Sequence, residues 1–159
     1  MVTGTGFQDG VMASFSGTGV TVNSVTFTDA TSIILNVSVD AAAATGARDL
    51  TLTNPDAGTS TTASAFTVVA RPVATSLSPS SRGQGAASQV ITVTGADFVS
   101  GMSASFSGTG VTVNSVSVTN STTATITITV SATASTDARD LTLTNTDAGT
   151  STRSSALTV

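Results

Sequence analysis

Residues 15–25 read FSGTGVTVNSV, and residues 106–116 read the same eleven letters again, 91 positions later. Sliding the whole sequence by 91 positions aligns residues 2–68 with residues 93–159 without a gap, and 42 of those 67 pairs are identical. Solenoid repeats are shorter, about 20–50 residues, so a 91-residue period is that of a small domain. The sequence therefore predicts two tandem copies of one module.

Within each copy, apolar and polar residues alternate, which is the pattern of a half-buried β-strand. TATITITV (123–130) places Ala, Ile, Ile and Val on one face and Thr on the other, and SIILNVSV (32–39) has the same parity in the first copy. In GVTVNSVTF (19–27) the apolar parity changes at Asn23-Ser24, which indicates a turn or a bulge. No window has a convincing helical period. Short strands between Gly, Asn and Asp turns predict an all-β sandwich for each copy.

The junction between the copies is abrupt. FTVVARPVATSLSP (66–79) runs from the last strand of the first copy through Ala70-Arg71-Pro72 into a new strand. A linker of two or three residues that contains Pro has little freedom compared with a Gly/Ser tether. We therefore expect domains at 1–69 and 70–159, placed end to end as a fairly stiff rod.

The composition excludes several classes of function. The chain has nine Asp and five Arg, a formal net charge of −4, and no Lys, Glu, His, Cys, Trp or Tyr. Without His or Cys there is no ordinary zinc, copper or haem site and no Ser-His or Cys-His pair. Five scattered Arg on an acidic chain do not form the basic stripe that nucleic acids need. We predict no enzyme activity, no catalytic, cofactor-binding or metal-binding residues, no cofactor and no nucleic-acid partner.

Composition also bears on location. No run of residues approaches the roughly 20 apolar residues of a membrane span, and the first residues lack a signal-peptide pattern. We expect no membrane insertion. A Lys-free, acidic chain rich in Thr and Ser suits an extracellular, cell-surface or virion-surface protein that stays soluble without adhering to polyanions. With only six Phe for stacking, the chain offers a carbohydrate partner little support.

The repeated acidic residues are the candidates for a calcium site. They are Asp49, Asp56, Asp140 and Asp147. Calcium takes about six to eight oxygens, usually from several carboxylates packed closely. The nearest pair in the second copy is Asp137 and Asp140, and the position that matches Asp137 is Gly46. We therefore favour solvated strand-end or turn roles over metal binding.

Three further patterns have a structural interpretation. Arg-Asp recurs at 48–49 and 139–140, where a local ion pair or an inter-domain contact is favoured over a ligand site. The glycines of SGTG, at 16–19 and 107–110, lack phosphate-loop spacing and are interpreted as hairpin glycines. The Thr ladder of 123–129 is not repeated in the first copy, so it indicates a solvated strand face and not an ice-binding one.

The stretch RPVATSLSPSSRGQGAASQVITVTGADF (71–98) resembles the opening of the IPT/TIG family of immunoglobulin-like domains. The matching residues are Pro72, Leu77, Pro79, Gly83, Gly85, Val90, Val93, Gly95 and Phe98. Further along, SASFSG (103–108) and DLTLTNTDAGTST (140–152) resemble the short Phe-Gly strand and the closing hairpin of the family. The resemblance covers all of the second copy and the last three quarters of the first. It implies a seven-stranded type of sandwich used for adhesion, spacing or protein contact, as in bacterial surface proteins.

One difference separates the copies. The second copy has 23 residues (70–92) before the match begins at Val93, whereas the first has only Met1 there. We expect the first copy to lack its N-terminal strand, which exposes core and an unpaired edge. Three explanations stay open: the sequence is a segment of a longer array, a partner donates the strand by β-augmentation, or the first copy tolerates the loss.

Together these patterns predict a non-enzymatic structural or adhesive module. It would be a stiff spacer or display rod of a bacterial extracellular, cell-surface or virion-exposed protein. Protein partners or self-association, including fibres, would use the exposed strand edge of the first copy. The alternatives are a carbohydrate- or receptor-binding adhesin domain and an accessory domain of a secreted polysaccharide-degrading enzyme.

Overall fold

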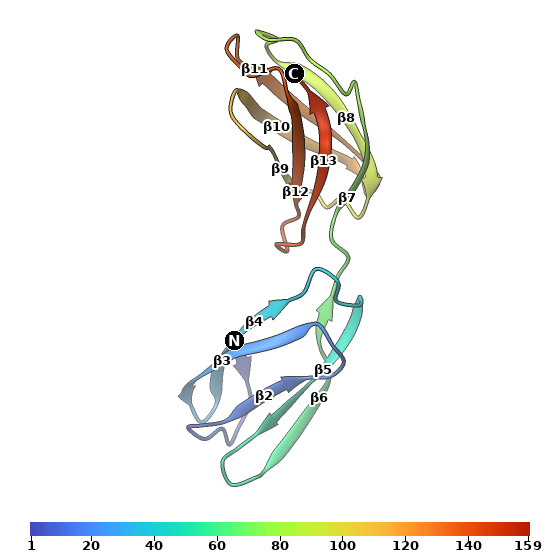
Figure 1. Cartoon of the computed structure of the whole chain (residues 1–159). Coiled ribbons are helices and arrows are strands. Elements are labelled where there is room, and N and C mark those ends of the chain that lie inside the picture. The colour runs from blue at the N-terminus through green and yellow to red at the C-terminus, as the bar shows by residue number, and fades with distance from the viewer. The chain divides into compact units, whose positions relative to one another are not determined.

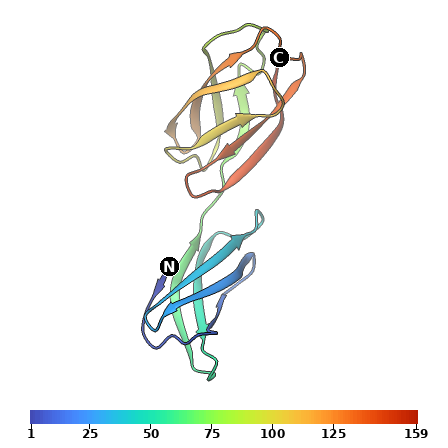
Figure 2. The same cartoon turned by 90° about the vertical axis from the view of Figure 1, so that its left-hand side faces the viewer.

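The computed structural model describes all residues from 1 to 159 and consists of thirteen β-strands without a helix (Figure 1). No element therefore has the form of an apolar helix that could cross a lipid bilayer. The chain divides into two compact units, Met1–Val69 (unit 1) and Ala70–Val159 (unit 2). Each unit is a sandwich of two antiparallel sheets (Figure 2), and the predicted all-β class is confirmed.

Unit 2 contains seven strands. They are β7 (Val73–Ser78), β8 (Gln89–Ala96), β9 (Ser103–Phe106), β10 (Val111–Asn120), β11 (Thr123–Val130), β12 (Ala138–Thr144) and β13 (Thr150–Thr158). One sheet has the order β10-β11-β8-β7 and the other β13-β12-β9. Between β7 and β8 the chain also reaches the second sheet, because Ser81 forms a parallel bridge with Thr158.

The core of unit 2 lies between these two sheets. The period-two pattern predicted for β11 is confirmed, since its inward residues are at most 1% exposed. Leu141 and Leu143 of β12 face them and are fully buried. The segment that precedes Val93 contributes Leu77 from β7 and Ile91 from β8 to the same cluster. The segment that precedes Val93 therefore helps to close the core between the two sheets.

Unit 1 contains six strands. They are β1 (Val2–Thr3), β2 (Met12–Phe15), β3 (Val20–Asp29), β4 (Ser32–Val39), β5 (Gly46–Thr53) and β6 (Thr59–Val68). Its sheets have the orders β1-β4-β3 and β2-β5-β6. With the 91-residue shift, β2 to β6 correspond to β9 to β13. β1 supplies two residues where β8 has eight, and β7 has no counterpart in unit 1.

The bulge predicted at Asn23-Ser24 is present. The β3–β4 register shifts between Val22 and Ser24, and the β10–β11 register shifts at the matching place, between Val113 and Ser115. A bulge inserts one unpaired residue and changes which side chains face inward. This accounts for the change of apolar parity in the sequence.

The interpretation of SGTG as a hairpin is wrong. Phe15 ends β2 in one sheet and Val20 begins β3 in the other, so the turn between them crosses from sheet to sheet. Gly19 has a φ of 83°, and a Cβ there would lie 2.8 Å from the Cα of Ala43. Glycine is therefore required at position 19 by the positive φ and by the close approach of the loop that contains Ala43. Neither requirement is specific to a hairpin.

Candidate functional site

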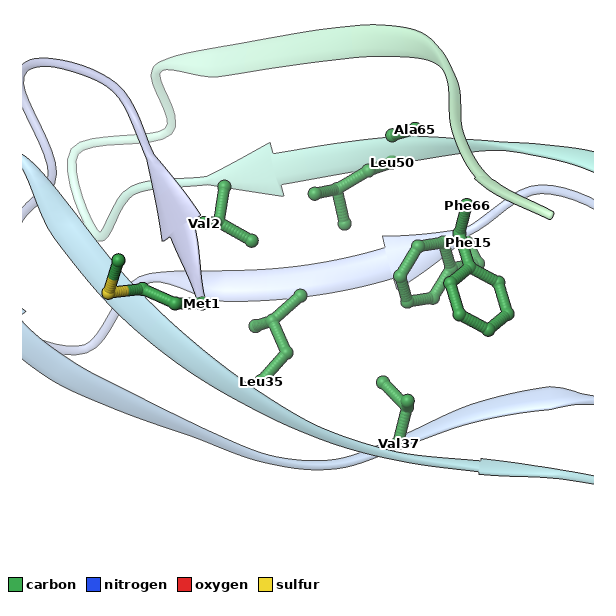
Figure 3. Close-up of a pocket in the computed structure, with 8 residues that line it drawn as sticks. All are labelled: Met1, Val2, Phe15, Leu35, Val37, Leu50, Ala65 and Phe66. Carbon is green, nitrogen blue, oxygen red and sulfur yellow. The ribbon is translucent and has the colours of Figure 1, made fainter. Parts of the chain in front are cut away.

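Unit 1 contains an apolar groove between its two sheets. The groove has a volume of about 230 Å³ and is lined by Met1, Val2, Phe15, Leu35, Val37, Leu50, Ala65 and Phe66. Figure 3 shows Leu35 and Val37 pointing from β4 towards the side chains of the facing sheet. The rings of Phe15 and Phe66 lie against each other with centroids 5.4 Å apart.

Several lining residues are more exposed than their counterparts in unit 2, although Leu50 is buried as Leu141 is. Leu35 and Val37 are half-buried, whereas the matching Ile126 and Ile128 are 0% exposed. Ala65 is exposed, whereas Ala156 is 4% exposed. The groove of unit 1 therefore corresponds to part of the closed core of unit 2, but it is open to solvent.

Beside the groove, β4 has an unpaired edge. β11 pairs along its length with β8, from Thr123 opposite Thr94 to Ile128 opposite Gln89. β4 pairs with β1 only through Ser32 and Ile33. Residues 34–37 thus have backbone partners in β3 but none on the side that β8 occupies in unit 2.

A second edge flanks the groove at the end of β6. In unit 2 the N–H of Thr158 donates to Ser80 O at 2.9 Å, and the N–H of Arg82 donates to Thr158 O at 3.0 Å. Thr67 is the counterpart of Thr158 and has no such backbone partners in unit 1. The groove is therefore bordered by two strand edges, one from each sheet. Sequence reasoning found the missing strand but not this second edge, because a parallel bridge between distant segments leaves no local pattern.

Two of the repeated Asp residues bond across neighbouring strands and two hold turns. Asp49 and Asp140 each accept the backbone N–H of a β6 or β13 serine at 2.8 Å. Asp56 accepts the N–H of Gly58, and Asp147 accepts the N–H of Gly149. No group of three or more carboxylates lies close enough together to hold a metal ion. Each of the four calcium candidates instead has a local structural partner.

Two carboxyl groups in unit 1 have lowered pKa values. Hydrogen bonds from the hydroxyl and N–H of Thr31, followed by the hydroxyl of Ser32, lower the pKa of Asp29. The N–H of Gly58 and the side-chain amide of Gln8 lower the pKa of Asp56. These bonds favour the charged carboxylate. Both groups are exposed and lie outside the groove, Asp29 at the end of β3 and Asp56 in the turn between β5 and β6.

The repeated Arg residues do not form the expected local ion pairs. The Arg139 side chain is 6% exposed and donates to the carbonyl of Ser135 at 3.0 Å, and Arg48 donates in the same way to Ala44. The Asp that follows each Arg lies at a register shift and accepts the N–H of a serine on the neighbouring strand instead. The guanidinium of Arg139 packs against Gly108, where an added Cβ would meet it at 2.0 Å. Arg48 and Arg139 therefore tie loops together.

Comparison with known proteins assigns unit 2. A family model described as the IPT/TIG domain matches residues 72–159, which is more than half of the chain and includes every strand of unit 2. No curated protein matches the sequence significantly.

Proposed function

Because this chain belongs to the IPT/TIG family of immunoglobulin-like domains, we propose that it is a non-enzymatic structural or adhesive module. It serves as a spacer or display element of an extracellular, cell-surface or virion-exposed protein. IPT/TIG domains are generally non-catalytic modules and often occur in adhesion or surface proteins. The acidic, Lys-free, Ser- and Thr-rich composition supports such a location.

The observation that carries the proposal is the use of the charged side chains. Asp49 and Asp140 accept backbone N–H groups, and Arg48 and Arg139 donate to backbone carbonyls. These groups serve the fold. Unit 1 also presents a pair of strand edges beside its apolar groove, which supports a role in contact with protein partners.

A spacer role is supported by the short connector. Val68 is buried and pairs with Gly46 in unit 1. Pro72 is fully buried in unit 2, and its carbonyl accepts the hydroxyl of Ser151. Three residues, Val69 to Arg71, therefore connect the two anchored ends. A connector of this length restricts motion more than a flexible tether does.

The spacer role is tested by the distance distribution between spin labels in the two units. The chain has no cysteine, so Thr26→Cys and Ser117→Cys, at equivalent exposed positions, give one defined label pair. We expect a narrow distribution, and a control with a Gly/Ser insertion after Val69 should broaden it. A distribution in the original chain as broad as that of the control would contradict the spacer role.

A further inference from the structure

We infer that the groove of unit 1 is a receptor for one polypeptide segment, made of two strands and the loop between them, that reproduces the pattern of residues 73–92 and comes from outside residues 1–159. The inference rests on the proposed structural role and specifies the partner of the open edge. In unit 2 the corresponding groove is filled by Val73–Thr92, which supplies Leu77 and Ile91 to the core. The occupant of unit 1 supplies the same two aliphatic side chains.

The lining of the two grooves supports a common occupant. Four lining positions are identical in the two units: Val2, Phe15, Leu50 and Ala65 match Val93, Phe106, Leu141 and Ala156. Leu35 and Val37 replace two isoleucines, and Phe66 replaces Leu157. Every one of these changes keeps an apolar side chain. A segment that packs against the lining in unit 2 therefore meets the same chemistry in unit 1.

The ladder of β1 fixes the register of the occupant. Val2 lies opposite Ile33, as Val93 lies opposite Ala124 in unit 2. Continuing that antiparallel register along β4 places the counterpart of Ile91 opposite Leu35. Because side chains alternate along a strand, this residue points into the groove and the counterpart of Val90 points to solvent.

The second edge requires more than a single strand. Thr67 has backbone groups in the position where Thr158 bonds with Ser80 and Arg82. Gly4 is the counterpart of Gly95. A Cβ at Gly95 would lie 1.8 Å from the carbonyl oxygen of Val73 in β7. Unit 1 therefore keeps the space for a β7-like strand as well as the edge that a β8-like strand pairs with. The occupant is a strand, a crossing loop and a second strand.

A second copy of this chain is a poor donor. Its residues 73–92 already fill unit 2, with Leu77 at 8% and Ile91 at 0% exposure. Moving them into the unit 1 groove of a neighbour would open an equal groove in the donor. The exchange replaces one set of contacts with an equivalent set and offers no net gain, so the occupant is a segment that is not already part of a folded unit.

The test uses the full chain and a synthetic peptide of residues 71–92, RPVATSLSPSSRGQGAASQVIT. We expect saturable binding with one peptide per chain in calorimetry. In heteronuclear NMR spectra the shift changes should be confined to unit 1 and largest at Leu35, Val37 and Thr67. Bound peptide should also slow amide hydrogen exchange along residues 34–37.

Matched changes in the peptide test the side-chain pattern without altering the protein. Ile91→Asp should weaken binding at least about tenfold, because the burial of one large aliphatic side chain is lost. Val90→Asp is the control, since Val90 is 53% exposed and adjacent in sequence. In the protein, Leu35→Asp should abolish binding, whereas Ile34→Asp, at a 50% exposed position on the other face of β4, should retain most of it.

Three outcomes would overturn the inference: absence of peptide binding, equal binding of the Ile91→Asp and Val90→Asp peptides, or shift changes in unit 2. Concentration-dependent dimers of the peptide-free chain in light scattering would also overturn it, by identifying a second copy as the occupant. A failure here leaves the spacer role standing if the label distances stay narrow, so the two proposals fail separately.

Discussion

Units 1 and 2 are identical at 42 of 67 aligned positions, yet their cores differ. Fifteen buried apolar residues lie in unit 2, and four, Val11, Ile33, Leu50 and Val68, lie in unit 1. The side chains that differ in burial, such as Leu35 and Ile126, are themselves equally apolar. The difference comes from the 23 residues that precede Val93 in unit 2. Burial in this fold is therefore decided by a neighbouring segment and not by the residue itself.

Truncation of one core residue in each unit should give the largest contrast. Ile126→Ala should lower the free energy of unfolding of unit 2 by about 2–5 kcal/mol, because it leaves a cavity in a closed core. Leu35→Ala should cost about 1–2 kcal/mol, because its side chain is already partly hydrated. Because the chain has no Trp or Tyr, NMR peak intensities of each unit report unfolding in urea. Equal losses in the two units would refute the contrast.

The next contrast concerns the glycine that β7 approaches. Gly95→Ala places a Cβ 1.8 Å from the carbonyl of Val73 and should destabilise unit 2 by about 1–3 kcal/mol through overpacking. Gly4→Ala meets only the ring of Phe7, which has room to rotate away in an open unit, so it should cost less. Thermal unfolding of both variants checks this order. A larger loss for Gly4→Ala would mean that the absent β7 strand does not explain the difference.

A third pair of variants should act equally in both units. Asp49 and Asp140 accept N–H groups from Ser64 and Ser155, which have positive φ angles of 53° and 49°. Asp49→Ala and Asp140→Ala should each cost about 1 kcal/mol for one lost hydrogen bond, because the same hydrogen bond of 2.8 Å is present in both units. Urea titration of each variant measures the loss. Unequal costs would show that the open groove also alters the rest of unit 1.

The smallest effect is a dependence on pH that differs between the units. The lowered pKa of Asp29 means that its hydrogen bonds stabilise unit 1 above the pKa of an unfolded Asp, about 3.9, and that this stability is lost as the pH falls through the folded pKa. Asn120 makes the equivalent bonds in unit 2 without titrating. Asp29→Asn should reduce the acid sensitivity of unit 1 in unfolding curves between pH 2 and 6. If the free energy of unfolding of unit 1 depends on pH in the same way after this substitution, groups other than Asp29 cause the acid sensitivity.

Much of the fold could be predicted from the sequence because its signals are local. The repeat fixes two copies, and the alternation in 123–130 fixes which residues of β11 are buried. The bulge at Asn23-Ser24 was detectable because it reverses apolar parity within one strand. The register shift between Arg48 and Leu50 in β5 was not predicted, because the alternation of apolar and polar residues is not interrupted there. The residue with the positive φ angle, Ser64, lies in the neighbouring strand.

The candidate site was only partly predictable, because sequence patterns report local structure and most of the site depends on distant segments. Comparison of the copies located the missing strand. The lining of the groove and the second edge at Thr67 depend on how distant segments pack, as does the burial of Arg139 against Gly108. No period or motif marks such contacts. Where two copies of a module exist, the complete copy supplies this information for the incomplete one.

Amide hydrogen exchange under native conditions tests the central claim most directly. It compares residues 34–37 of β4 with residues 125–128 of β11, which differ in whether a strand pairs with their outer edge. Unpaired backbone groups at an open edge exchange faster than those inside a sheet. We predict rapid exchange for those N–H groups of residues 34–37 that do not bond to β3, and strong protection throughout residues 125–128. Equal protection of the two segments would show that unit 1 is closed, and would contradict the account.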